Sequence, residues 1–246
     1  MDGGEDDVRE PSVGERGRLL SRWAAMLASL PTDRPQPWRL CEALRKLVGA
    51  DGAAITIAYL SDARTTVCAT DEVISGLESL QEVLGEGPGP DAARTSEAVV
   101  ADIDGSSRWP MLAQAVDEQF GPLRLHAIPL DAGDGLLGVV TFYTPIGADL
   151  AEPAENAVFL VNAAGPALAA DSADHSLDDG DDDPWSSRAV VHQATGMIMA
   201  QLRVPPGDAL ALLRGHAYAL ETDVADVAER VIDRSINFSN FEVEGD

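Results

Sequence analysis

The side chains best suited to catalysis or metal binding are few in this chain and widely separated. Its four histidines fall in four different segments: His126, His175, His192 and His216. None of them has a serine or cysteine partner at a spacing typical of nucleophilic catalysis. Asp102 and Asp104 stand two residues apart at the end of a predicted strand, which gives no matched acid and base. The sequence therefore predicts a protein that is not an enzyme.

The cysteines give no indication of a metal or redox centre. Cys41 and Cys68 lie in apolar surroundings and lack C-x-x-C spacing, so we expect buried, unreactive thiols. His175 and the run Asp181–Asp183 have the chemistry of metal ligands, but a charged run of this kind is typical of a solvated linker. No metal and no cofactor is predicted, since histidines and cysteines do not cluster as haem or iron–sulfur sites require.

The C-terminal quarter, Ser186–Phe238, has the pattern of three amphipathic helices. Apolar residues recur at helical spacing in three groups: Val191, Ala194, Ile198 and Leu202; Leu210, Leu213, Ala217 and Leu220; Val224, Val227, Ala228, Val231 and Ile232. Pro205 and Pro206 separate the first helix from the second. Thr222 and Asp223 offer a cap and a first-turn carboxylate for the third. Because each helix has one apolar face, the three are predicted to form an all-α bundle.

Gly196 interrupts the first of these helices. A glycine inside a helix costs roughly 1 kcal/mol relative to alanine, so its presence needs a reason. Either the helix packs closely against a neighbour at this point, or a partner molecule approaches its backbone. The neighbouring residues Ala194, Met197 and Met199 are consistent with both explanations.

This stretch resembles the ANTAR domain, the RNA-binding module of bacterial transcription antiterminators. The resemblance covers nearly all of Ser186–Phe238 and is carried by Ala194-Thr195-Gly196-Met197-Ile198-Met199, by Ala209, Leu213-Arg214 and Ala217, and by Asp226-Val227-Ala228. It implies binding to RNA stem-loops in nascent transcripts. The residues within the matched motif that we predict to contact RNA are His192, Gln193, Thr195, Gly196 and Arg214.

Two positions depart from the family pattern. Thr195 stands where many members carry a lysine, and Pro205 stands where the second helix usually has a serine-type cap. Pro206 presets the backbone angle of the first helical residue, so the fold is expected to survive. Both departures are expected to affect the contact with RNA.

Residues 38–171 alternate between predicted strands and helices. Strands are predicted at 53–60, 65–70, 98–103, 125–130 and 136–143, and helices at 38–48, 73–84, 109–118 and 151–169. This order predicts an α+β domain with an antiparallel sheet covered by helices.

Four segments of this part resemble a GAF domain, the small-molecule sensor fold: Leu84–Pro88, Val99–Ile103, Arg108–Pro110 and Leu137–Tyr143. The resemblance implies either a cavity for an unidentified effector or a domain that only mediates dimerisation. We interpret the loop Gly85–Pro88 as the mouth of that cavity, because no G-K-[ST] follows it and Glu86 would repel a phosphate.

These patterns divide the chain into five segments. They are an acidic tail with an amphipathic helix at 1–37, the GAF-like domain at 38–171, an acidic linker at 172–185, the ANTAR-like bundle at 186–238 and an acidic tail at 239–246. The N-terminal helix, predicted at 15–30, either packs back on the next domain or joins two copies of the chain.

Acidic residues dominate, with 42 Asp and Glu against 17 Lys and Arg and a formal net charge of −25. Such a surface disfavours non-specific binding of nucleic acids. Residues 188–238 are nearly neutral, with 5 arginines against 6 acids, which is compatible with RNA binding without indicating it. DNA binding is not expected, because no basic recognition helix is visible. Neither a signal peptide nor an apolar run of spanning length occurs, so we expect a cytoplasmic protein.

The predicted function is a signal-responsive regulator of transcription antitermination. In it, the GAF-like domain controls the binding of dimeric ANTAR-like bundles to paired RNA stem-loops. The predicted partners are RNA, a second copy of the chain, and an effector that is either a small molecule or a regulatory protein. The competing interpretation is a protein-interaction or dimerisation module that has lost RNA binding, which the acidic charge and Thr195 favour.

Overall fold

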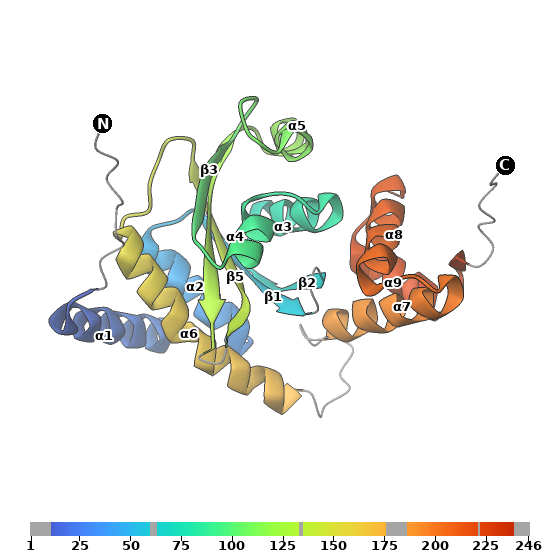
Figure 1. Cartoon of the computed structure of the whole chain (residues 1–246). Coiled ribbons are helices and arrows are strands. Elements are labelled where there is room, and N and C mark those ends of the chain that lie inside the picture. Colours follow the sequence, from blue (N-terminus) through green and yellow to red (C-terminus); the bar gives the residue numbers. More distant parts are fainter. Residues whose placement is uncertain (1–10, 60–62, 133–134, 176–185, 221, 239–246) are drawn as a thin grey trace.

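The computed structural model describes residues 11–59, 63–132, 135–175, 186–220 and 222–238. The chain forms two parts, which lie side by side in Figure 1. We call residues 11–175 the sheet domain and residues 186–238 the helical bundle.

Five antiparallel strands form the centre of the sheet domain. They are β1 (Gly52–Tyr59), β2 (Ala63–Ala69), β3 (Val99–Ile103), β4 (Leu123–Asp131) and β5 (Leu136–Pro145), arranged in the order β2-β1-β5-β4-β3. The pairs β1–β2 and β4–β5 join strands that are consecutive in the chain, and β1 pairs with β5 to complete the sheet. The predicted α+β fold with an antiparallel sheet is therefore confirmed. Residues 60–62, at the connection between the first two predicted strands, lie outside the described residues.

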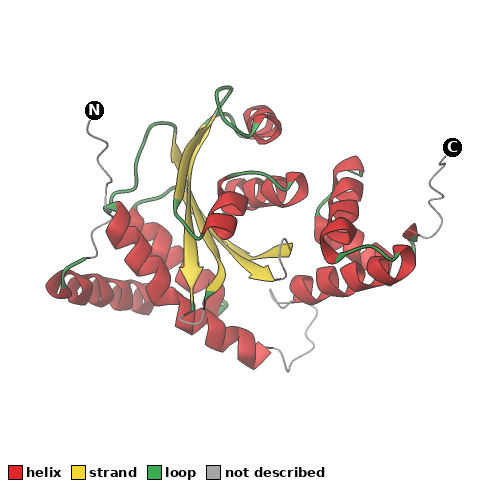
Figure 2. Ribbon diagram, viewed as in Figure 1, coloured by secondary structure: helices red, strands yellow, loops and turns green. Residues whose placement is uncertain are grey.

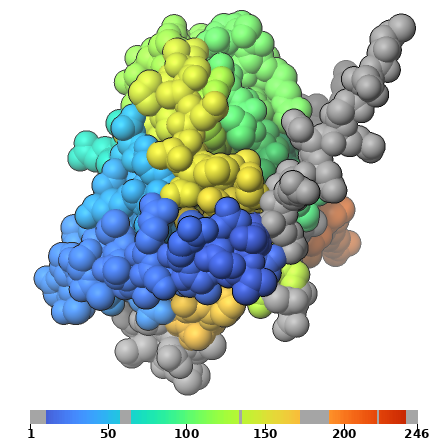
Figure 3. Space-filling view, turned by 90° about the vertical axis from the view of Figure 1, so that its left-hand side faces the viewer, coloured from blue at the N-terminus to red at the C-terminus, as the bar shows by residue number. Residues whose placement is uncertain are grey.

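Helices cover both faces of this sheet, as Figure 2 shows. One face carries α2 (Gln36–Val48) and α6 (Ala154–His175), with α1 (Val13–Ser29) outside them. Leu19 of α1 is buried, and Trp23, Met26 and Leu27 pack against the same core. In this structure α1 therefore packs back on its own domain, where Figure 3 shows it lying across the surface.

The other face carries α3 (Glu72–Leu84), α4 (Pro88–Thr95) and α5 (Pro110–Gln119). A loop was predicted at Gly85–Pro88, and no helix was predicted between it and the strand at 98–103. The structure keeps a loop at Gly85–Gly87, but α4 begins at Pro88. Both prolines of α4 fall in its first turn, where a missing N–H costs nothing and the fixed φ angle suits the helix.

Helix α6 is longer than predicted, since it continues to His175. Its last turn overlaps the first residues of the segment predicted to be the acidic linker. The rest of that segment, 176–185, lies outside the described residues.

The helical bundle contains the three predicted helices, α7 (Ser186–Leu202), α8 (Pro206–Ala219) and α9 (Val224–Ile232). Its core is formed by apolar side chains from all three helices, together with Phe238, which follows α9. The helical members of this core are Val191, Ala194, Ile198, Ala209, Leu210, Leu213, Ala217, Val224, Val227, Ala228 and Val231. Leu220, predicted to belong to this core, is instead 48% exposed at the end of α8. Asp223 is the N-cap of α9, with its side chain accepting a hydrogen bond from the Asp226 N–H at 2.9 Å.

Candidate functional site

The exposed face of α7 holds three of the five residues predicted to contact RNA. His192, Gln193 and Gly196 are exposed, on the side of the helix opposite the buried Val191 and Ala194. A Cβ atom placed on Gly196 would meet nothing within 4 Å. Close packing against a neighbouring helix is therefore not the reason for this glycine, and its backbone lies open at the surface.

Arg203 extends this face beyond the predicted residues. It follows α7 directly, is exposed, and has a left-handed backbone with φ 58° that ends the helix. Its N–H donates to the Met199 carbonyl at 2.8 Å. The spacing from Gly196 to Ala200 and on to Arg203 follows one side of a helix, a pattern that could have identified this arginine from the sequence. We call His192, Gln193, Gly196 and Arg203 the α7 surface.

Thr195 does not belong to the α7 surface. It is 2% exposed, and its hydroxyl donates to the Val191 carbonyl at 2.7 Å, one turn earlier in the same helix. The hydroxyl is thereby satisfied inside the bundle core. Because Val191 is part of the apolar stripe, a residue four positions later also faces the core. In this conformation Thr195 supports the packing of α7 and offers no surface to RNA.

Arg214 lies on α8, half-buried, at the boundary with the sheet domain. A Cβ atom placed on Gly85, just after α3, would lie 3.4 Å from Arg214 Nη1. Val83, in the last turn of α3, packs against the core of the helical bundle. Helices α8 and α9 both contact α3 (Figure 1). The five predicted residues therefore divide among the surface, the core and this boundary, and do not form one patch.

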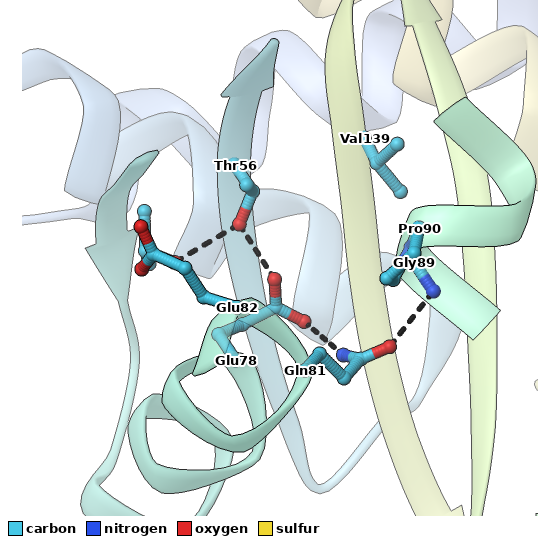
Figure 4. Close-up of a pocket in the computed structure, with 8 residues that line it drawn as sticks. Thr56, Glu78, Gln81, Glu82, Gly89, Pro90 and Val139 are labelled. Atoms are coloured by element: carbon cyan, nitrogen blue, oxygen red, sulfur yellow. Dashed lines mark hydrogen bonds between the residues drawn. The ribbon is translucent and has the colours of Figure 1, made fainter. Parts of the chain in front are cut away.

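A small cavity lies inside the sheet domain, beside α3 (Figure 4). It is lined by Thr56, Thr66, Glu78, Gln81, Glu82, Gly89, Pro90 and Val139. The cavity has room for about one water molecule. None of the predicted mouth residues Gly85–Pro88 lines this cavity, whereas Gly89 and Pro90, which follow them directly, do.

The polar lining of this cavity is a connected hydrogen-bond network. The Thr56 hydroxyl donates to Glu78 Oε2 at 2.6 Å, and Gln81 Nε2 donates to Glu78 Oε1 at 2.8 Å. Gln81 Oε1 in turn accepts from the Gly89 N–H at 2.8 Å. Glu78 is 5% exposed and Gln81 1%. The network joins β1, α3 and the start of α4, and its carboxylate favours a ligand that donates hydrogen bonds.

Gly87 is required by this arrangement. Its φ of 136° is one that side chains rarely adopt, and a Cβ there would lie 2.5 Å from Gln81 Oε1. The glycine therefore lets the chain pass close to the buried amide of Gln81.

Other polar clusters of the sheet domain are structural. Arg124 holds both carboxylate oxygens of Asp102, at 2.7 and 3.0 Å, and this pairing lowers the pKa of Asp102. Burial lowers the pKa of His126, whose Nε2 lies 3.0 Å from the Thr144 hydroxyl.

The two thiols lie close together between α2 and β2. Cys41 is fully buried, and burial raises its pKa, with a hydrogen bond from the Cys41 thiol to Cys68 adding to the effect. Cys68 Sγ also lies 3.4 Å from the Pro37 carbonyl, one helical turn before Cys41. Cys68 is only partly buried, so the prediction of a fully buried thiol was wrong for this residue.

Across the described ranges, no three His, Cys, Asp or Glu side chains gather in a way that would hold a metal ion. No helix in the described part of the chain combines the length and apolar character needed to cross a membrane.

Comparison with known proteins identifies the bundle. Residues 185–232 match the family model of the ANTAR domain. No curated protein sequence matches the chain.

Solved structures with a similar arrangement include GAF domains. The GAF domain of A. aeolicus Nlh2 in an inactive state aligns at 15% identity and a TM-score of 0.42, covering 64% of this chain and 94% of that one. The GAF domain of a phosphoenolpyruvate-protein phosphotransferase from Coxiella burnetii aligns at 14% identity and a TM-score of 0.44, covering 68% and 97%. At these TM-scores the alignments indicate no ligand or partner for this chain. The protein thus combines an α+β domain, whose structural neighbours include GAF domains, with an ANTAR domain at residues 185–232.

Proposed function

We propose that this protein is a signal-responsive regulator of transcription antitermination whose helical bundle binds RNA stem-loops in nascent transcripts. The observation that carries the proposal is the ANTAR match over residues 185–232. The open α7 surface within that match supports it, since it brings together polar side chains and an uncovered backbone. The proposal places the protein in the cytoplasm, where transcripts are made, and assigns it no DNA or membrane partner.

The α7 surface has the chemistry needed to read exposed bases. Sequence-selective proteins recognise unpaired RNA bases by stacking and by hydrogen bonds to base edges. The His192 ring offers a stacking plane, and the Gln193 amide offers one acceptor and two donors. Gly196 lets a nucleotide approach the helix without meeting a side chain, and Arg203 supplies a positive charge for a phosphate. With so few cations, the affinity is expected to depend on salt only weakly.

The direct test is RNA affinity measured by fluorescence anisotropy, with stem-loops selected from total cellular RNA and a version with scrambled loops. We expect Gly196→Leu to weaken loop-dependent binding at least tenfold, because the leucine covers the open backbone. Gly215→Leu is the matched control, since Gly215 also sits in an exposed helix position with nothing within 4 Å. Equal affinities for the two variants and wild type would contradict the role of the α7 surface.

The proposal includes two bundles acting together on paired stem-loops. Tyr218 and Leu220, at the end of α8, are 60% and 48% exposed, and large apolar side chains at the surface favour self-association. These residues also support the second candidate function, a dimerisation module that no longer binds RNA. Light scattering of the full chain, with and without RNA, separates the two. A dimer that retains no stem-loop at any salt concentration would favour the second candidate.

The effector of the sheet domain remains part of the proposal. The cavity beside α3 holds about one water molecule, so a larger effector must open the contact between Gln81 and Gly89. The lining offers the Glu78 carboxylate as an acceptor, which suits a small molecule with amine, amide or hydroxyl donors. A regulatory protein is the alternative effector.

A further inference from the structure

We infer that the sheet domain holds the helical bundle through Val83, Gly85 and Arg214, and that this interdomain contact and RNA compete for Arg214. The contact itself is independent of any RNA. The competition rests on the proposed function, because it requires the bundle to bind RNA.

The interdomain contact is formed by the last turn of α3. Val83 lies in that turn, yet its side chain packs against the bundle core and not against the core of its own domain. The Arg214 guanidinium lies against Gly85, the residue that ends α3. Helix α7 also approaches β2. Val83 and Arg214 thus contribute an apolar and a charged side chain to the contact.

Electrostatics explain why an arginine occupies this position. The C-terminal end of a helix carries partial negative charge from carbonyl groups without intrahelical partners, and cations are stabilised there. The last turn of α3 contains no basic residue of its own. Arg214 brings that cation from the bundle. Gly85 adopts a left-handed conformation with φ 67°, which stops the helix and leaves space for the guanidinium.

The same arginine belongs to the ANTAR match. Its guanidinium is half-buried here, whereas a phosphate contact requires it to face solvent. It cannot lie against Gly85 and against a phosphate at the same time. The α7 surface, in contrast, is open in this conformation. The contact therefore removes one RNA-binding cation and leaves the rest of the proposed RNA surface accessible.

The cavity is one turn from this contact along α3. The Gln81 carbonyl accepts the Gly85 N–H at 3.0 Å, while its side chain belongs to the cavity network. An occupant that displaces the Gln81 side chain therefore acts on the turn that holds Arg214. This arrangement gives the sheet domain a direct route to the bundle.

The test uses the full chain and two measurements, the radius of gyration from small-angle X-ray scattering and the affinity for stem-loop RNA. Val83→Asp places a charge in the contact, and we expect a larger radius of gyration and RNA binding that is about three- to tenfold tighter. Val100→Asp is the matched control, because Val100 is 54% exposed on the edge strand β3. It should change neither quantity.

The role of Arg214 is tested in the Val83→Asp background, in which the bundle is expected to leave the sheet domain. Because Val83→Asp frees the guanidinium, adding Arg214→Ala should return the affinity to about the wild-type value while the radius stays large. Val83→Ser repeats the test with a milder change, should the aspartate reduce folding as judged by circular dichroism.

The possible outcomes distinguish the interdomain contact from the competition for Arg214. An unchanged radius of gyration for both Val83 variants overturns the interdomain contact. A larger radius with unchanged RNA affinity overturns the competition for Arg214. No RNA binding by any variant contradicts the proposed function, whereas the scattering result still decides the contact.

Discussion

The sheet domain and the helical bundle use polar groups in different ways. The sheet domain buries charged and polar side chains in connected networks, such as Thr56, Glu78 and Gln81 beside the cavity. The bundle has a core of small apolar side chains, and Thr195 is the polar residue that it buries. Buried networks fix one geometry, because every group must find its partner. A small apolar core fixes geometry less strictly and depends more on what surrounds it.

The comparison suggests a division of roles. The sheet domain can convert the displacement of one hydrogen-bond partner into a change at its surface, because the network links three elements. The bundle offers a surface that needs little internal change to bind. The predictions that follow test this difference, beginning with the largest expected effect.

The isolated bundle, residues 186–238, should be helical but only marginally stable. A unit of about fifty residues buries little surface, which leaves a small margin of stability, and in the intact chain Val83 packs against its core. Thermal unfolding followed by circular dichroism at several concentrations is the measurement. A cooperative transition at high temperature that does not depend on concentration would show that the bundle needs no partner.

Gln81→Leu should destabilise the sheet domain by about 2 kcal/mol or more. The change leaves the Gly89 N–H and the Glu78 carboxylate without the amide that joins them, and a buried group without a partner costs about 1–3 kcal/mol. Urea unfolding gives the free energy of unfolding.

The matched control for this change is Gln114→Leu. The Gln114 side chain bonds Glu118 at the surface of α5, where water replaces the lost partner, so the effect should stay within about 0.5 kcal/mol. Equal losses for both variants would mean that the cavity network contributes nothing special to stability.

The sheet domain should also lose stability in mild acid because of His126. Burial lowers the pKa of His126 from 6.5. As the pH falls below 6.5, the histidine therefore becomes protonated in the unfolded chain before it does so in the folded chain. The free energy of unfolding is then highest above pH 6.5 and falls as the pH drops through the folded pKa. Urea unfolding between pH 7.5 and 5 should show this slope in wild type and a flatter one in His126→Asn. His192→Asn, a change at an exposed histidine, is the control. If both variants flattened the dependence of the free energy of unfolding on pH, burial of His126 would not be the cause.

Much of this difference between the regions was visible in the sequence. Apolar periodicity predicted the five strands, their antiparallel arrangement and the three helices of the bundle, since the repeat of a pattern reports which face of an element is buried. The same periodicity, read fully, would have placed Thr195 inside the bundle. The helix α4 was not predicted, since its eight residues include two prolines and a glycine and show no clear apolar repeat, although prolines in the first turn are compatible with a helix.

No pattern in the sequence indicated the contact between the sheet domain and the helical bundle. Val83 and Arg214 are single residues on two helices far apart in the chain, and no repeat connects them. Gly196 was ambiguous for a similar reason, because a glycine chosen for packing and a glycine chosen for access look alike in sequence. Only the position of neighbouring atoms separates the two.

The smallest expected effect concerns that glycine. Gly196→Ala should stabilise the bundle within the full chain by about 0.5–1 kcal/mol, because alanine favours the helix and its methyl group would meet nothing within 4 Å. Gly165→Ala makes the same change in α6, where the Cβ would lie 2.0 Å from the Asp131 carbonyl oxygen. That variant should lose stability, since helix and sheet must move apart to admit the methyl group. Denaturant unfolding should therefore show a higher free energy of unfolding than wild type for Gly196→Ala and a lower one for Gly165→Ala. A loss of stability for Gly196→Ala would mean that the first helix does pack closely at this point, and that the open backbone proposed for RNA is covered in solution.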